Sequence, residues 1–434
     1  MTTPLDGLDL TDEQITEAWV YVLGRYLVLR QEHVDLAEPG VGYNVLKHNP
    51  PVLAGTGAGA APTFVNPNLD VVYSEAWVAV DERTPALLEV PDVPAGTYYT
   101  AQIVDEWAEI VQNVNERTLP EHPHGTYALC LAGSSPQIPD GAYRIDLPSA
   151  KAKVLTRVQI VDDVAKAVDL QHRFTVRSTG HPQIEPAVDV PMFTNAEPAA
   201  SALFERPRLD QALAAPDRSG RLPDMLPLLD ALSSYVAADP AHAAALDAFV
   251  RTTSFPGFLY LMTHLSEAHH GWTSTGDRDS FGDDVGFRTA ANFAGIWWNA
   301  ASEAIYMPLQ TDAAGVEPTG GTVYRQRFAP GDGPGDHVDG YWSLTVYAYP
   351  SMMLVPNPAG RYEVSYRSRL ALDDDGGFTL VFATRRPSDV AEENWLPLPP
   401  DGERFTAILR TYLPRPEVRS GAWTPPAIVP DGPA

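Results

Sequence analysis

The amino-acid sequence predicts an α+β fold that is mostly β, with a β-rich N-terminal domain, a helical connecting segment and a C-terminal antiparallel β-sandwich. Short apolar runs separated by turn residues fill the first 177 residues. Helical patterns then occupy most of 194–301, and short alternating runs return from 306 onward. The expected domain boundaries are therefore 1–177, 178–302 and 303–434. A chain of 434 residues is long enough for more than one hydrophobic core.

The N-terminal domain is expected to begin with an amphipathic helix over 11–32. Thr11 and Gln14 form a capping-box pattern there, ahead of apolar residues at helical spacing. A second helix is expected at 162–172, with Asp162 or Asp163 as its N-cap. Between these helices, β-like runs bounded by turn residues predict strands at 70–80, 86–90, 97–104, 109–113, 125–131, 142–145 and 154–161.

The same kind of pattern defines the connecting segment and the sandwich. Helices are expected at 200–213, 226–238, 241–250, 258–268 and 287–305. Strands are expected at 322–328, 341–349, 361–366, 378–383 and 405–412. The acidic, glycine-containing run at 373–377 predicts a hairpin turn.

The strand expected at 341–349 shows strict alternation. Trp342, Leu344 and Val346 occupy its apolar positions, so these side chains are expected in the core of the sandwich. The positions between them carry aromatic or hydroxyl groups. Such a face suits a contact between two sheets or a binding surface.

Composition and charge narrow the class of protein. The formal net charge of −26 disfavours binding to nucleic acid or to an anionic membrane. No apolar run is long enough for a membrane span, and the N-terminal residues do not have the pattern of a secretory signal. Cys130 is the only cysteine, which excludes an intramolecular disulfide and a multi-cysteine metal site. A cytoplasmic location is therefore expected.

Two sets of motifs cover nearly the whole chain. The first starts with NLDVVYS at 68–74 and continues through Tyr98-Tyr99, Gln102, Asp105 and Arg157. The second contains YWSLT at 341–345 and extends through Asn357-Pro358, Arg361-Tyr362, Asn394-Trp395 and WTPP at 423–426.

With these motifs the chain resembles the bacterial proteins that pair the domains of unknown function numbered 1254 and 1214. The resemblance implies a β-rich N-terminal domain, a helical connection and a C-terminal β-sandwich, and most members have no assigned reaction. One departure is Val71, which stands where the family usually has threonine. The chain also shows no typical export signal, which favours a cytoplasmic member of the family.

The first candidate site is the polar segment that enters the strand expected at 70–80. Asp70 is a candidate catalytic base and Tyr73 a second catalytic residue, with Asn68 as a substrate-binding partner. A glycine-rich segment at 55–59 precedes them and is able to act as a lid over a cavity that these residues line. The structural alternative is an Asx turn, in which Asn68 and Asp70 bond the nearby backbone.

The second candidate site lies on the strand expected at 97–104. Asp105 beside aromatic residues would have the raised pKa that a general acid needs, and Tyr99 and Gln102 are candidate substrate-binding residues. The alternative is a strand end where Asp105 caps the following segment or pairs with Arg117 or Arg157. Arg361 and Tyr362 complete the substrate-binding candidates, since an arginine can clamp a carboxylate. An arginine beside a Pro-Asn-Pro turn more often has a structural role, in which it ties loops together by bonding their carbonyls.

No cofactor or metal motif is present in the sequence. His264, Glu267, His269 and His270 form the only histidine cluster, but they do not have the H-E-x-x-H zinc spacing. The glycine-rich segment at 55–59 is followed by neither a helix start nor a lysine, as a phosphate loop would be. We therefore expect neither a metal nor an organic cofactor.

These observations favour an intracellular enzyme that acts on a small molecule by hydrolysis or by elimination/isomerisation. Carboxylates and tyrosines in an N-terminal or interdomain cleft would supply the acid–base chemistry. The alternative is a non-catalytic ligand-binding or scaffolding protein. A homodimer is also expected. One sandwich core is not expected to bury all the aromatic side chains of the chain, among them Trp297, Trp298 and the tyrosines on one face of the strand at 341–349, which leaves some for a subunit interface.

Overall fold

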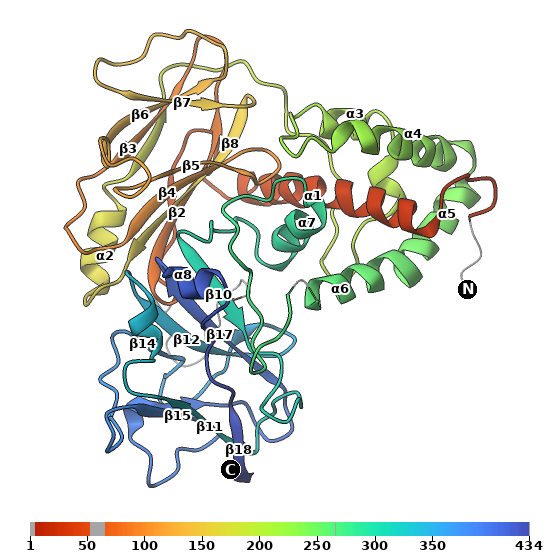
Figure 1. Ribbon diagram of the computed structural model, residues 1–434. Helices are drawn as coiled ribbons and strands as arrows, with labels where there is room; N and C mark the ends of the chain where they lie inside the picture. The colour runs from red at the N-terminus through yellow and green to blue at the C-terminus, as the bar shows by residue number, and fades with distance from the viewer. Residues whose placement is uncertain (1–4, 53–65, 265, 434) are drawn as a thin grey trace.

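The structure, a computed structural model, describes residues 5–52, 66–264 and 266–433. Its fold is α+β and mostly β, as the sequence predicts. Figure 1 shows a β-rich N-terminal part, a C-terminal β part below it and a group of helices at the side of both.

The helix predicted at the N-terminus is α1, Asp12–Leu36. Its capping box is confirmed, since the Gln14 N–H donates to the Thr11 hydroxyl and the Gln14 side chain accepts from the Thr11 N–H. The middle of α1 is buried on all sides rather than on one stripe. The helices of the connecting segment pack around it, although the expected boundaries place α1 with the N-terminal domain.

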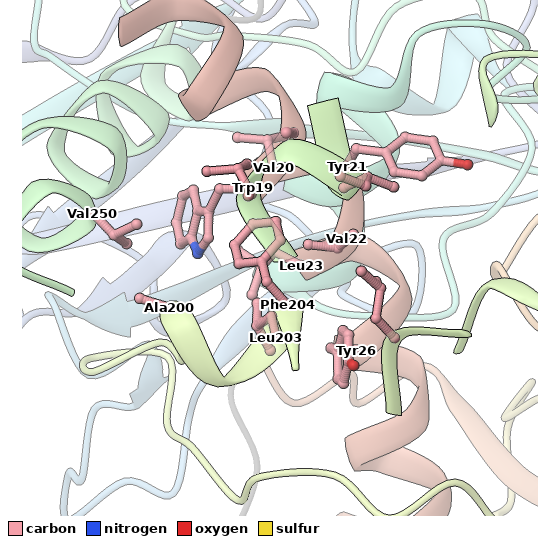
Figure 2. Packing of buried hydrophobic residues seen from close by; sticks show 14 of the residues in the cluster. Trp19, Val20, Tyr21, Val22, Leu23, Tyr26, Ala200, Leu203, Phe204 and Val250 are labelled. Carbon is pink, nitrogen blue, oxygen red and sulfur yellow. The ribbon is translucent and has the colours of Figure 1, made fainter. Parts of the chain in front are cut away.

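Six further helical elements form this group: α3 (Arg208–Leu213), α4 (Leu222–Ala238), α5 (Pro240–Phe249), α6 (Phe255–Thr263), α7 (Val285–Ala294) and a short 3-10 turn at Ser201–Phe204. A π-type turn, Val250–Ser254, joins α5 to α6. Figure 2 shows how Trp19, Leu23 and Tyr26 of α1 pack against Leu203 and Phe204. The core of the helical group is thus built around α1.

Two sheets form the N-terminal domain. One has five antiparallel strands in the order β1 (Lys47–His48), β2 (Val71–Ala79), β8 (Lys151–Gln159), β4 (Tyr99–Val104) and β5 (Ile110–Val114). The other has the order β7 (Tyr143–Leu147), β6 (Gly125–Leu131), β3 (Ala86–Val90) and β9 (Thr175–Ser178), with β6 and β7 parallel. A core of aliphatic side chains lies between the two sheets. Helix α2, Val164–Gln171, is capped by the Asp163 side chain, one of the two predicted caps.

The C-terminal domain is the predicted sandwich. One sheet contains β10 (Ala304–Pro308), β17 (Phe405–Tyr412), β12 (Trp342–Ala348) and β13 (Met353–Leu354), with β14 (Glu363–Ser365) also paired to β12. The other contains β16 (Trp395–Pro397), β15 (Phe378–Ala383), β11 (Thr322–Phe328) and β18 (Val429–Pro433). The pairing is antiparallel except between β15 and β16. Trp342, Leu344 and Val346 lie in the core between the sheets, as predicted.

Three local predictions are wrong. The helix expected at 287–305 ends at Ala294, because Ile296 and Trp297 have φ angles of 35° and 56°, which an α-helix cannot contain. The helix expected at 200–213 is interrupted at Pro207, which has no N–H to continue it. The turn at 373–377 does form, but it joins β14 to β15, which belong to different sheets, so it closes no hairpin.

Trp297 and Trp298 are both buried within a single chain. Trp297 packs edge-on against Trp77, and Trp298 packs against Phe281 and Phe287. These tryptophans are therefore not left over for a subunit interface, and the homodimer stays a prediction without their support. No helix in the described part of the chain combines the length and apolar character needed to cross a membrane.

Candidate functional site

The five-stranded N-terminal sheet lies next to the β10–β17–β12 sheet of the sandwich (Figure 1). Side chains of both domains pack together at this junction. Alternation along each strand directs one row of side chains toward the partner domain. We call the polar groups gathered there the junction cluster: Asn68, Asp70, Tyr73, Tyr98, Gln102 and Arg157 from the N-terminal domain, and Tyr306, Ser343, Arg410 and Tyr412 from the C-terminal domain.

Asp70 is fully buried at the point where β2 begins, and it bonds both domains. Its Oδ2 accepts a hydrogen bond from the Ser343 hydroxyl, and its Oδ1 lies 3.4 Å from Nη2 of Arg367. Burial raises the pKa of the Asp70 carboxyl, against the opposing effects of Ser343, Arg410 and Arg367. The carboxyl therefore holds its proton more readily than an exposed aspartate does.

Asn68 forms the Asx turn that the sequence offered as the structural alternative, and its side chain also bonds a residue of the other domain. Its side-chain oxygen accepts from the Asp70 N–H at 2.8 Å, which is the Asx-type turn. Its Nδ2 donates to the Tyr412 hydroxyl at 2.5 Å. The turn thus positions an amide against a tyrosine of the other domain.

Glu363 provides a second carboxyl beside Asp70, with its side chain 14% exposed, and the sequence did not indicate it. Both carboxyls share Arg367, whose Nη2 lies 2.5 Å from the Glu363 Oε1. The other carboxyl oxygen of Glu363 is buried and has no hydrogen-bond partner among the described residues. Burial, followed by repulsion from Asp70, raises the pKa of Glu363 to about 7.

This pKa predicts how stability depends on pH. Glu363 takes up its proton more readily in the folded protein than in the unfolded chain, where its pKa is 4.5. As pH rises from about 4.5 to about 7, the unfolded chain releases the proton first, so the contribution of Glu363 to the free energy of unfolding falls by up to about 3 kcal/mol. Urea denaturation across this range should show a weaker pH dependence for Glu363→Gln than for the wild type. The exposed Glu82→Gln variant is the control, and equal slopes for all three proteins would contradict the assignment.

Arg157, on β8, is the central cation of the junction. Its Nη1 donates to the Gln102 Oε1 at 2.9 Å and its Nη2 to the Trp297 carbonyl at 3.0 Å. Gln102 in turn donates to the Trp298 carbonyl at 2.7 Å. Gln102, which the sequence predicted as a substrate-binding residue, therefore orients Arg157. It links β4, on which it lies, to the segment that follows α7.

Tyrosines from both domains surround Arg157. Tyr341 stacks on Tyr412 with ring centroids 4.1 Å apart, and Tyr98 lies edge-on to both rings. Burial raises the pKa of Tyr73 to about 12 and that of Tyr98 and Tyr412 well above the usual value. These phenols are therefore neutral at neutral pH and act as hydrogen-bond donors. Tyr73 remains only half-buried, as does Tyr306 on the opposite side.

Asp105 lies far from Asp70. Its Oδ1 accepts from the backbone N–H groups of Trp107 and Glu109, and its Oδ2 lies 3.6 Å from Arg218. This is the capping alternative, with Arg218 as the cation in place of Arg117 or Arg157. Positions along β8 show how far apart the two aspartates are. The Asp70 carbonyl accepts from the N–H of Ile160, just after β8, whereas Val104, the residue before Asp105, lies opposite Lys153 on β8. At about 3.3 Å per residue, the two carboxyls are roughly 20 Å apart and cannot act on the same bond. Burial raises the pKa of Asp105 to about 6.

Tyr99 also lies outside the cluster. It packs in the core between the two N-terminal sheets, and its hydroxyl donates to the Pro123 carbonyl at 2.6 Å. Arg361 belongs to a loop in which the Asn357 side chain bonds both its N–H and its carbonyl. Tyr362 packs at the edge of the junction against the cluster that contains Tyr347. The backbone of Arg361 is therefore part of a structural loop, which agrees with the structural role considered for this residue.

The histidine cluster does not lie on one helix. Helix α6 ends at Thr263, and His264 caps it while its ring bonds the Tyr260 carbonyl. His269 pairs through its backbone with Trp272, beyond the helix. In the described residues, no three potential ligands of the His, Cys, Asp or Glu type gather to hold a metal. The glycine-rich segment at 55–59, expected to form a lid, lies outside the described residues.

Two pockets in the described part of the chain lie away from Asp70. One, of about 10 Å³, has room for about one water molecule beside Lys153, Glu75 and Trp77. The other lies in the helical group near Tyr235 and His242. That Asn68, Asp70 and Tyr73 line the principal cavity therefore stays a prediction; the structure places them in the junction and not on the outer surface.

Sequence reasoning missed several members of the cluster. The sequence indicated Arg157 only as a motif residue and as a possible ion-pair partner of Asp105, and it did not indicate Arg410 or Tyr412 as site residues. A signal for the last two was available: on β17, Arg410 and Tyr412 alternate with the apolar core residues Leu409 and Ala407. This pattern directs Arg410 and Tyr412 away from the sandwich core.

Two family models match parts of this chain. Residues 44–178 match the family described as a protein of unknown function (DUF1254), and residues 303–416 match the one described as a protein of unknown function (DUF1214). The chain pairs a DUF1254 domain with a DUF1214 domain. The resemblance given by the sequence motifs is thereby confirmed, in the same order along the chain. The DUF1254 domain contributes Asp70, Tyr73 and Arg157 to the junction cluster, and the DUF1214 domain contributes Tyr306 and Arg410.

Two solved structures are similar. The crystal structure of the VPA0106 protein from Vibrio parahaemolyticus has a TM-score of 0.67 and 18% identity, over 97% of this chain and 99% of that one, which shows a shared fold. An uncharacterized protein from Burkholderia cenocepacia has a TM-score of 0.45 and 13% identity, over 97% and 95% of the two chains. No protein of curated description matches this chain.

Proposed function

We propose that this DUF1254–DUF1214 protein is a cofactor-independent enzyme that acts on a small molecule at the junction cluster, by hydrolysis or by elimination/isomerisation. One observation carries the proposal. Tyrosines from both domains gather around the buried Arg157, and two of them, Tyr73 and Tyr306, keep part of their surface accessible. Hydroxyl and guanidinium donors aimed at one place stabilise an oxygen that becomes negative during a reaction.

Both reaction types use the same arrangement. Hydrolysis of an ester places negative charge on a tetrahedral oxygen, and removal of a proton beside a carbonyl places it on an enolate oxygen. Tyr73, held neutral by its raised pKa, is the proposed proton donor. Asp70 is the carboxyl of the site, and Gln102 is a positioning residue that acts through Arg157.

A specific observation favours the alternative of a non-catalytic binding protein. Both oxygens of Asp70 already face partners, Ser343 on one side and Arg367 on the other. In this case the cluster has many hydrogen-bond donors, but its carboxyl, Asp70, is not free to take a proton from a substrate. The assay below separates the two functions.

Purified protein should be tested with a panel of aryl esters, lactones and carbonyl compounds. Product formation would detect hydrolysis, and NMR in deuterated water would detect exchange of the proton beside the carbonyl. We expect turnover of at least one compound and a loss of about 10²-fold in Tyr73→Phe. Tyr99→Phe is the matched control, because its hydroxyl bonds a backbone carbonyl outside the cluster. Equal losses in both variants, or no turnover at all, would count against catalysis at the junction.

We further propose a cytoplasmic protein with a small molecule as its partner, without nucleic acid or membrane binding, and most simply a homodimer. The net charge of −26 supports the exclusion of polyanions. Cys130 is buried and unpaired, so nothing in the described residues depends on an oxidising compartment.

A further inference from the structure

We propose that the junction cluster binds an organic monoanion, with its carboxylate on Arg157 and its apolar part among the tyrosine rings. This inference rests on the proposed function, because it names the ligand class of the same site. It starts from the charge of Arg157. The side chain is 4% exposed, and the two hydrogen bonds it makes go to neutral oxygens, those of Gln102 and the Trp297 carbonyl.

Two other buried arginines in the described part of the chain are compensated by a carboxylate, whereas the buried Arg410 bonds only neutral oxygens. Arg25 lies 3.0 Å from Glu106, and Arg288 lies 2.7 Å from Asp217. Arg157 has no such ion pair in the described part of the chain, and the groups that act on it most strongly are four tyrosines. Burial of an unpaired charge costs several kcal/mol, so a buried guanidinium of this kind indicates a place for an anion.

The tyrosines do not provide the missing negative charge. Tyr73, Tyr98 and Tyr412 all have pKa values that burial raises, so they remain neutral phenols. Their hydroxyls instead add donors to those of Arg157. The buried Tyr98 hydroxyl has no partner among the described residues, and the Tyr412 hydroxyl accepts from Asn68 and so keeps its own hydrogen to donate. An acceptor-only group complements such a set, and a carboxylate is one.

The surrounding charges favour a monoanion over a phosphate dianion. Arg410 feels the charge of Asp70 without forming an ion pair with it in the described residues, and Arg367 is shared by Asp70 and Glu363. The groups that act most strongly on Arg157 are tyrosines and not a carboxyl, and a single negative charge balances it. A dianion would leave a buried charge uncompensated beside two carboxyls. The rings of Tyr73, Tyr306 and Tyr98 provide apolar walls, which suits the body of an organic acid and not an inorganic ion.

The test is calorimetric titration of the intact protein with benzoate, hexanoate, benzamide and inorganic phosphate. We expect at least one carboxylate to bind, with affinity reduced about 10- to 100-fold in Arg157→Gln by loss of a charge-assisted hydrogen bond. Arg157→Lys, which keeps the charge, should regain part of the affinity and covers the case in which the Gln variant does not fold. The control is Arg177→Gln, an exposed arginine on β9, which should bind as the wild type does. Benzamide, the neutral counterpart of benzoate, should not bind.

The outcomes separate this inference from the proposed function. Equal binding of benzamide and benzoate, tighter binding of phosphate, or unchanged carboxylate affinity in Arg157→Gln would overturn the carboxylate assignment. If Tyr73-dependent turnover is found in the same preparation, the proposed function stands and the ligand class alone is wrong. If no carboxylate binds and no turnover is found, both are wrong.

Discussion

Replacing Asp217 by alanine is expected to lower the free energy of unfolding by about 3–5 kcal/mol. The Asp217 side chain is fully buried, and its Oδ1 lies 2.7 Å from Nη1 of Arg288, which is also buried. Its Oδ2 accepts hydrogen bonds from the hydroxyls of Tyr21 and Ser219. This carboxylate therefore joins α1, α7 and the segment before α4 at the centre of the helical group.

The size of the effect follows from what alanine would leave behind. Arg288 lies over the Trp107 ring at 4.5 Å, and two of its nitrogens already have no hydrogen-bond partner among the described residues. Without Asp217 its charge would remain in an aromatic environment with no anion. Urea denaturation followed by circular dichroism measures the loss. The control is Asp224→Ala, an acidic residue 74% exposed in the same helical group, which should change stability by less than about 1 kcal/mol. A loss in Asp217→Ala no larger than in this control would show that the pair contributes nothing.

Replacing Asp70 by asparagine is expected to lower turnover by about 10²-fold or more while the protein still folds. Asparagine keeps the size of the side chain and an oxygen that accepts from the Ser343 hydroxyl. Because burial raises the pKa of Asp70, a neutral group at this position also costs little folding energy. What is lost is the carboxyl that holds and releases a proton beside Arg367 and Arg410.

Asp105→Asn is the matched variant, and its turnover should stay within a few-fold of the wild type. Its Oδ1 can still accept from the backbone of Trp107 and Glu109, and it lies at the other end of the sheet. The substrate found in the panel above serves for both measurements. Equal losses in the two variants would remove Asp70 from the mechanism. Loss of turnover with a chelator and its return with zinc, while Asp70→Asn stays active, would point instead to His264, Glu267 and His269.

Much of the local structure could be predicted because it depends on neighbouring residues. Strands β3, β6, β11, β15 and β17 have the bounds expected from period-2 patterns and turn residues. The capping box of α1 was also predictable, since Thr11 and Gln14 satisfy each other within one turn. Very short strands such as β1 and β13 were missed, because two residues carry no periodicity.

Other predictions failed where long-range packing overrides the local pattern. The run at 287–305 looks helical throughout, yet Trp297 leaves the helix to pack on Trp77 and to accept a hydrogen bond from Arg157 through its carbonyl. Asp105 and Asp70 both stand at the ends of strands and looked alike as acid–base candidates. The antiparallel register of β2, β8 and β4 sends them to opposite ends of the same sheet.

By itself, the sequence determined the α+β class, the order of the three parts, the family pair and the two faces of the strand at β12. It showed that one face of β12 is polar, but not what that face meets. Only the tertiary structure brought Asp70 to Ser343, Glu363 to Arg367, and the tyrosines of both domains to Arg157. The physical reason is that side chains two residues apart on a strand point to the same face, so the sequence of one strand is enough to predict its two faces. The contact between two polar sheet faces depends instead on how two complete domains pack, and no local pattern encodes it.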